Sequence, residues 1–246
     1  MENHSDLDAV FQQWPFKPGA ISARLVRTAN GREVLQMRIE MGLLQMEMAG
    51  RPDGEKPGGE TTYLDFIQKQ ALKEGETFAL SASQCMELDR EFLQFYQRRI
   101  CCLALRQFAR GMADANHTIA LMDFAAKHSL NPEWTLSYEQ YRPFVLFHRA
   151  QAAAMVELQR SGPEAAIEVL NTGLGEMKLL FVRLEMEEQF DRDELVGQLV
   201  ELKESLRQEY HVGRTLAEQL ADAVAGEQYE YAAKLRDEIA QRRGGI

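Results

Sequence analysis

The sequence predicts a mainly α-helical protein with a small three-stranded antiparallel β-meander near its N-terminus and a helical hairpin at its C-terminus. Two periodicities support this prediction. Apolar and polar side chains alternate with a period of two between residues 21 and 48, as in half-buried strands. From residue 61 onward, apolar side chains recur at spacings of three and four, as on one face of a helix.

The meander is predicted by a turn signal and by the alternation around it. Asn30-Gly31 favours a hairpin because both residues tolerate positive φ. The apolar members of the second and third strands are Leu35, Met37, Ile39, Met41, Leu44, Met46 and Met48. We expect this Met-rich face either to pack against a helix of the same chain or to serve as an adaptable partner surface, because Met side chains re-pack readily.

A loop follows the meander. The segment from Gly50 to Gly59 contains two prolines and four glycines, which predicts an exposed loop. It looks like a phosphate-binding loop only superficially, because no Gly-Lys-Ser/Thr sequence follows to bind phosphate and magnesium. We therefore expect no nucleotide, and no motif in the chain predicts another cofactor.

Successive helical hairpins are expected over residues 61–190. The predicted helices span about 62–75, 82–110, 112–128, 137–160 and 163–187. Asn131-Pro132 and Ser161-Gly162 separate them. Residues 162–170 resemble the second helix of a tetratricopeptide-type repeat, so we expect a repeat-like body, with a plain helical bundle as the alternative.

Two further features concern the later helices. Gly173 and Gly175 weaken their helix and are expected to permit close approach of another helix. Leu195, Leu199, Leu202 and Leu206 share one face of a charged helix over about residues 192–210, which is typical of a coiled-coil seam or of a helix lying on a bundle. The predicted parts of the chain are residues 1–60, 61–190, 191–213 and 214–246.

Charge and composition argue against several classes of function. The chain carries 38 acidic and 28 basic residues, a net charge of −10, and no dense basic patch of the kind that duplex DNA requires. We therefore expect no direct nucleic-acid binding. No apolar run reaches the roughly eighteen residues of a membrane span, and the N-terminus does not resemble a signal peptide. These observations predict a cytoplasmic protein without a membrane partner.

No catalytic or metal site is predicted. Cys85, Cys101 and Cys102 lack the spacing of a zinc site and are interpreted as small buried residues of a reducing compartment. None of the five histidines belongs to a metal-binding motif. His148 lies in a run of aromatic residues and is interpreted as a hydrogen-bonded core residue in preference to a general base. We expect that the protein is not an enzyme.

The C-terminal segment carries the most informative pattern. Two short amphipathic helices are expected on either side of Gly226. The second contains the run from Tyr229 to Ile239, YEYAAKLRDEI, which resembles the UVR motif found at the C-termini of the excision-repair proteins UvrB and UvrC. Some Clp-type ATPases and their regulators also carry this motif. The resemblance implies a protein-docking hairpin in which Tyr229 takes the place usually held by Phe.

The resemblance and the helical spacing together give candidate partner-binding residues. They are Leu216, Leu220, Val224, Tyr229, Ala232, Ala233, Arg236, Asp237 and Ile239. A hairpin of about thirty residues cannot build a self-sufficient core, so its apolar edge must meet another surface. That surface belongs either to a partner, to a second copy, or to this chain's own 195–206 face.

These observations predict a non-enzymatic scaffold protein. It would dock a partner with a UVR-type or UVR-binding surface, or a second copy of itself, through its C-terminal hairpin. The known owners of the motif give two alternatives: an accessory factor of nucleotide excision repair that binds UvrB/UvrC-like proteins, and an adaptor or regulator of a Clp-type protease. An enzyme of unknown type is a further alternative, which would need a polar pocket within the helical body.

Overall fold

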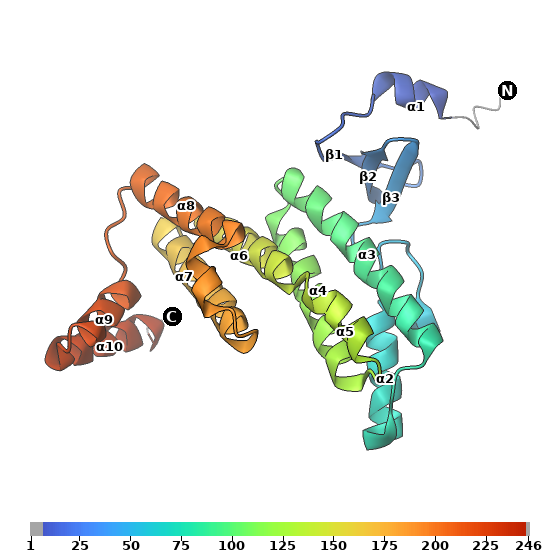
Figure 1. Cartoon of the computed structure of the whole chain (residues 1–246). Helices are drawn as coiled ribbons and strands as arrows, with labels where there is room; N and C mark the ends of the chain where they lie inside the picture. The colour runs from blue at the N-terminus through green and yellow to red at the C-terminus, as the bar shows by residue number, and fades with distance from the viewer. Residues whose placement is uncertain (1–6, 245–246) are drawn as a thin grey trace. The chain divides into compact units, whose positions relative to one another are not determined.

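The computed structural model describes residues 7–244 and confirms a mainly α-helical fold (Figure 1). Within these residues there are ten α-helices and one sheet of three antiparallel strands. The chain divides into two compact units, residues 1–149 and 150–246. None of the helices in the described part of the chain has the length and apolarity that a membrane crossing requires.

The predicted meander forms the sheet of the first unit. Its strands, in spatial order, are β1 (Ser22–Arg27), β2 (Glu33–Ile39) and β3 (Gly42–Glu47). The β1–β2 turn lies at Asn30-Gly31 as predicted, but only Gly31 adopts positive φ, at 83°. The Asn30 side chain instead accepts a hydrogen bond from the Thr28 hydroxyl at 2.6 Å.

The Met-rich face of the sheet packs against α3 (Ala82–Ala104). Leu35 and Met46 are buried with Ile100, Cys101 and Cys102 of that helix. Of the two interpretations of this face, packing within the same chain is therefore the correct one. Met41, which was expected on the buried face, lies in the β2–β3 turn and is 91% exposed, because β2 ends at Ile39.

The opposite face of the sheet is covered by a helix that the sequence did not predict. This helix, α1 (Asp8–Gln13), leads into Trp14. The guanidinium of Arg38 lies 4.1 Å from the ring of Phe11, and its Nε donates to the Trp14 carbonyl at 3.1 Å. The guanidinium of Arg24 lies 4.2 Å from the Trp14 ring. Because each guanidinium lies over an aromatic ring, the two arginine side chains can be partly buried on this face of the sheet.

Three helices of the first unit begin at residues whose side chains cap them. Thr62 caps α2, Ser81 and Gln84 form a capping box at α3, and Asn131 caps α5. The remaining bounds are α2 (Tyr63–Glu74), α4 (Phe108–His128), α5 (Pro132–Glu139) and α6 (Arg142–Arg160), of which α6 continues past residue 149. The expected break at Asn131-Pro132 is real, but Pro132 starts a new short helix, so the next long helix begins at Arg142 and not near residue 137.

A buried carboxylate joins α2, α3 and α4. Glu91 is fully buried and accepts hydrogen bonds from the N–H groups of Tyr63 and Leu64 at 2.6 and 3.0 Å. These are the first two N–H groups of α2, which have no partner within the helix and favour a negative charge. The Nε2 of His117 lies 2.9 Å from the same carboxylate.

Two arginines fix the loop that follows β3. Arg51 is buried and donates to Glu87 of α3 at 2.9 Å, so the loop expected to be exposed is anchored at its start. Arg98 of α3 pairs with Asp114 of α4 and also donates to the carbonyls of Glu47 and Gly50 at 2.9 and 2.8 Å. The end of the sheet is therefore bound to the helices by charge-assisted hydrogen bonds.

The second unit consists of helices and one 3-10 segment. Its elements after α6 are α7 (Pro163–Arg183), η3 (Glu187–Arg192), α8 (Glu194–Glu209), α9 (Leu216–Ala225) and α10 (Tyr229–Gly244). Val196, Leu199 and Leu206 are the buried residues of α8, which packs against α7. Of the two expectations for this helix, packing on a bundle is therefore the correct one. Within the described residues it does not form a coiled-coil seam.

The two glycines of α7 differ in their surroundings. A Cβ on Gly173 would lie 2.5 Å from the Cβ of Ala150 on α6, whereas a Cβ on Gly175 would meet nothing within 4 Å. Close helix approach is therefore correct for Gly173 and wrong for Gly175, which lies on the exposed side of the helix.

Four helices end at a residue that is not glycine but adopts positive φ. These residues are Arg106, Glu185, His211 and Glu227, after α3, α7, α8 and α9. At each end, the following N–H donates to a carbonyl five residues back, for example Gln107 to Cys102 at 2.7 Å. This is the Schellman arrangement, which usually has glycine at the left-handed position. Helices expected to run to about residues 110 and 187 end at Ala104 and Arg183 for this reason.

Candidate functional site

The C-terminal hairpin has the helices that the sequence predicted. The helix α9 begins at a capping box, in which the Glu218 N–H donates to the Thr215 hydroxyl at 3.3 Å and the Thr215 N–H donates to the Glu218 carboxylate at 3.0 Å. It ends at Ala225 with Gly226 as its C-cap, and the chain turns at Glu227 into α10. Figure 1 shows α9 and α10 lying side by side.

A small apolar cluster holds the two helices together. Its buried members are Ala223, Ala232 and Leu235, and Leu216 and Leu220 pack against them. The alanines permit the two backbones to lie close together. This cluster contains three of the candidate partner-binding residues, Leu216, Leu220 and Ala232, which therefore stabilise the hairpin itself.

Val224 does not continue the face of Leu216 and Leu220. Residues 216, 220 and 223 follow one face of a helix at 3.6 residues per turn, so Ala223 takes the buried position. Val224 is rotated away from that face and is 52% exposed. In the sequence, only the helical period indicates that Ala223 is the buried residue of this turn.

The remaining candidates lie outside the cluster. Tyr229 is 67% exposed, Ala233 and Ile239 are half-buried, and Arg236 pairs with Asp237 at 3.0 Å on the exposed side of α10. Val224 and Tyr229 lie on either side of the α9–α10 turn. Tyr231 follows on α10; it is 47% exposed, and its hydroxyl donates a hydrogen bond to Gln219 of α9 at 3.2 Å. We name Val224, Tyr229 and Tyr231 the apolar tip.

Glu218 ties the other end of α9 to the preceding helices. Its carboxylate accepts two hydrogen bonds from Nη2 of Arg207 on α8 and one, at 3.2 Å, from Nδ2 of Asn171 on α7. Lys203 lies 3.8 Å away. Burial alone would raise the pKa of Glu218, but the Thr215 N–H and the hydrogen bonds and charge of Arg207 hold that pKa below its ordinary value.

This contact bears on the expectation that the hairpin docks on its own chain. The contact with α8 uses Arg207 and Lys203 and not the apolar face of residues 195–206, whose buried members pack against α7. A cleft of about 530 Å³ separates the hairpin from α7 and is lined on the hairpin side by Leu216, Ala217 and Ile239. Sequence reasoning missed Glu218, although the Thr-x-x-Glu spacing at Thr215 is a recognisable capping-box signal.

His148, Cys101 and Cys102 are buried, whereas Cys85, which was expected to be buried, is only partly so. Burial and the charge of Arg99 lower the pKa of His148 to about 4, and its Nδ1 accepts a hydrogen bond from Arg99. Burial raises the pKa values of Cys101 and Cys102 to about 12, so both stay protonated at neutral pH. Within residues 7–244, no group of three His, Cys, Asp or Glu side chains is placed to hold a metal ion. His4 lies outside the described residues.

Comparison of the chain with protein-family models finds no match, and no curated protein or solved structure matches it. The resemblance of residues 229–239 to the UVR motif therefore rests on those residues alone.

Proposed function

We propose that this protein is a non-enzymatic scaffold that docks a protein partner, or a second copy of itself, through the C-terminal hairpin. The observation that carries the proposal is the apolar tip. A hairpin whose cluster consists of two alanines and three leucines contributes little burial, and yet it leaves two tyrosines and a valine in solvent. Val224 and Tyr229, which flank the turn, are the most exposed of the three, and exposed apolar and aromatic side chains close to one turn are typical of a binding surface.

The arrangement of the hairpin supports the same proposal. Glu218 holds the first turn of α9, and the apolar tip begins six residues later, about 9 Å along the helix axis. The hairpin is thus fixed at one end by polar contacts, and its apolar side chains are presented at the other. The three cysteines are free thiols, which favours a reducing, cytoplasmic setting.

The two more specific functions remain secondary proposals. Partnership with UvrB/UvrC-like repair proteins, or with a Clp-type protease, follows from the resemblance to the UVR motif. The net charge of −10 favours repair partnership through protein contacts only, so the isolated protein should not shift DNA in a gel.

The proposal is tested by removing the tip without removing the hairpin. The double variant Val224→Ser with Tyr229→Ser should abolish the association that the full chain shows, which is self-association in sedimentation velocity or retention of a partner from native extract. The control is Leu179→Ser, which removes an equally exposed apolar side chain from α7. A chain ending at Gly213 should behave like the double variant.

The possible results separate the alternatives. A repair protein or a Clp ATPase that binds directly, as purified protein, to the full chain but not to the tip variant would identify the partner. Self-association lost in the tip variant would identify a second copy. Equal behaviour of the full chain, the tip variant and the truncated chain would refute the docking role.

A further inference from the structure

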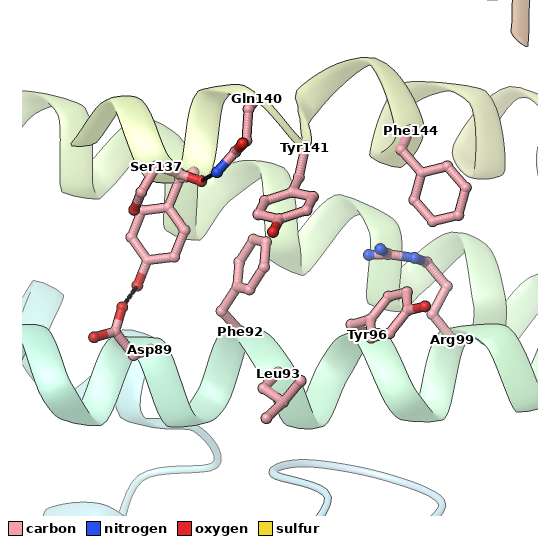
Figure 2. A pocket seen from close by; sticks show the side chains of 10 residues that line it. Asp89, Phe92, Leu93, Tyr96, Arg99, Ser137, Gln140, Tyr141 and Phe144 are labelled. Atoms are coloured by element: carbon pink, nitrogen blue, oxygen red, sulfur yellow. Dashed lines mark hydrogen bonds between the residues drawn. The ribbon is translucent and has the colours of Figure 1, made fainter. Parts of the chain in front are cut away.

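A second candidate binding site lies within the first unit. It is a cleft of about 690 Å³ between α3 on one side and α5 with the start of α6 on the other. Its walls are largely aromatic, from Phe92, Tyr96, Tyr138, Tyr141 and Phe144 (Figure 2). Half-open apolar clefts of this size are typical of small-ligand sites.

Arg99 lies at one end of this cleft. Figure 2 shows its side chain between Tyr96 and Phe144. The residue is 1% exposed, and its Nη1 and Nε donate to the Thr118 hydroxyl at 2.9 Å and to His148 Nδ1 at 3.3 Å. Both acceptors are neutral at neutral pH. Among residues 7–244, no carboxylate lies within ion-pair distance of Arg99, and its Nη2 has no hydrogen-bond acceptor.

This arginine is an unusual buried charge. The nearby carboxylate of Asp114 is already engaged by Arg98, at 2.7 Å. Burial lowers the pKa of Arg99 to about 10, although the charge of Asp114 acts to raise it, so the side chain is still a cation at neutral pH. A buried cation without a counter-ion is costly, and an anion entering the cleft would relieve that cost.

The other end of the cleft is already satisfied. Asp89 accepts hydrogen bonds from the Tyr138 hydroxyl at 2.6 Å and from Trp134 Nε1 at 2.9 Å. The first of these is drawn as the dashed line at Asp89 in Figure 2. The cleft is therefore polarised, with an aromatic body and one unpaired cation at Arg99.

We infer that this cleft binds an apolar, ring-bearing molecule through a single carboxylate that pairs with Arg99. One guanidinium matches one carboxylate, whereas a phosphate dianion would leave a buried charge uncompensated. Between Asp89 and Arg99 the helix rises by about 15 Å, which accommodates one or two rings. The same chemistry occurs in a free aryl acid and in the C-terminal carboxylate of a peptide that ends in an aromatic residue.

The test uses the full chain and matched pairs of probes in calorimetric titrations. The first pair is 4-biphenylacetate and its uncharged amide, and the second is N-acetyl-Phe-Phe as the acid and as the amide. Each acid that binds should do so at least about tenfold more tightly than its amide, because a hydrogen-bonded charge pair is lost in the amide. Arg99→Met should abolish this preference.

Two further variants keep the test decisive if Arg99→Met does not fold. Tyr141→Ala removes a half-exposed ring at the mouth of the cleft and should weaken binding of the acids, whereas Tyr210→Ala, a similarly exposed tyrosine of the second unit, should not. Tighter binding of the biphenyl acid would assign the site to free small acids, and tighter binding of the peptide acid would assign it to protein C-termini. Equal binding of acid and amide, no binding of either acid at about 10 mM, or indifference to Tyr141→Ala would overturn the inference.

Discussion

Arg207 on α8 and Glu218 on α9 form a two-point ion pair, with Nη2 of the arginine 2.7 and 2.9 Å from the two carboxylate oxygens. The same carboxylate caps α9 through the Thr215 N–H and accepts from Asn171. One side chain therefore starts the hairpin and fixes it to the rest of the second unit.

The first prediction concerns this contact. Glu218→Gln should weaken the attachment of the hairpin by about 1–3 kcal/mol, because it replaces hydrogen bonds to a charged group by neutral ones. Hydrogen exchange of the amides of residues 215–220 should accelerate accordingly. Glu230→Gln, on the exposed side of α10, is the control and should leave that exchange unchanged.

The pH dependence of this attachment follows from the lowered pKa of Glu218. The contribution of a carboxylate whose pKa is depressed by folding is complete above its ordinary value and is lost as the pH falls through the depressed value. The exchange of residues 215–220 should therefore lose its protection only in acid, and the Glu218→Gln variant should show no such transition. A transition that is the same in both proteins would contradict this assignment.

The second prediction uses the two glycines of α7. Gly173→Ala should destabilise the second unit by about 1–3 kcal/mol, because the added methyl group would overlap the Cβ of Ala150. Gly175→Ala should stabilise it by about 0.5–1 kcal/mol, because alanine favours the helix and meets no neighbour. Urea unfolding of the two variants measures the difference, and shifts of the same sign would refute the close approach of α6 and α7.

The third prediction concerns the turn of the hairpin. Glu227 adopts φ of 55°, which is strained for any residue except glycine. Glu227→Gly should therefore stabilise the hairpin by about 0.5–1 kcal/mol, even though glycine makes the unfolded chain more flexible. Lys234→Gly, within α10, should destabilise it by about 1 kcal/mol. Hydrogen exchange of the α10 amides reports both effects. Exchange that is no slower in Glu227→Gly than in the unchanged chain would argue against the left-handed turn.

The fourth prediction concerns His148. Its pKa is about 4 in the folded protein and about 6.5 in an unfolded chain, so the unfolded chain binds the proton first as the pH falls. The stability that neutral His148 contributes is complete above about pH 6.5 and should decrease by about 3 kcal/mol as the pH falls to 4. His148→Gln should lose less stability over this range, as measured by urea unfolding. An identical pH dependence in both proteins would exclude the shift.

The elements with local signals were predictable from the sequence. The Asn30-Gly31 turn and the paired C-terminal helices both depend on neighbouring residues, and each was located correctly. The ends of α3 and α7 were not predictable. Both are made by residues without a turn preference, Arg106 and Glu185, which adopt the left-handed conformation because the Schellman hydrogen bonds compensate for it.

The polar contacts between distant segments were also beyond sequence reasoning. Arg99 and His148 are 49 residues apart, and nothing local in either segment indicates that they meet. The aromatic residues that line the cleft next to Arg99 follow the helical period, and that period alone does not distinguish a cleft from a core position. In the C-terminal hairpin, by contrast, the period was informative, and the misplacement of Val224 arose from following a spacing of four where the helix uses three.

The attachment of β3 to α3 has a consequence for folding and for inheritance. Arg98 of α3 donates to the carbonyls of Glu47 and Gly50, and Arg51 lies beside Glu87 and Glu91 of α3. Without α3, the meander and its loop would lose the partners of these carbonyls and of Arg51, and without the meander, Glu87 and Glu91 would lose the charge of Arg51. The meander and α3 should therefore unfold in one cooperative step. We expect a deletion or recombination event that separated them to leave neither fragment folded, so these two parts of the chain should be inherited together.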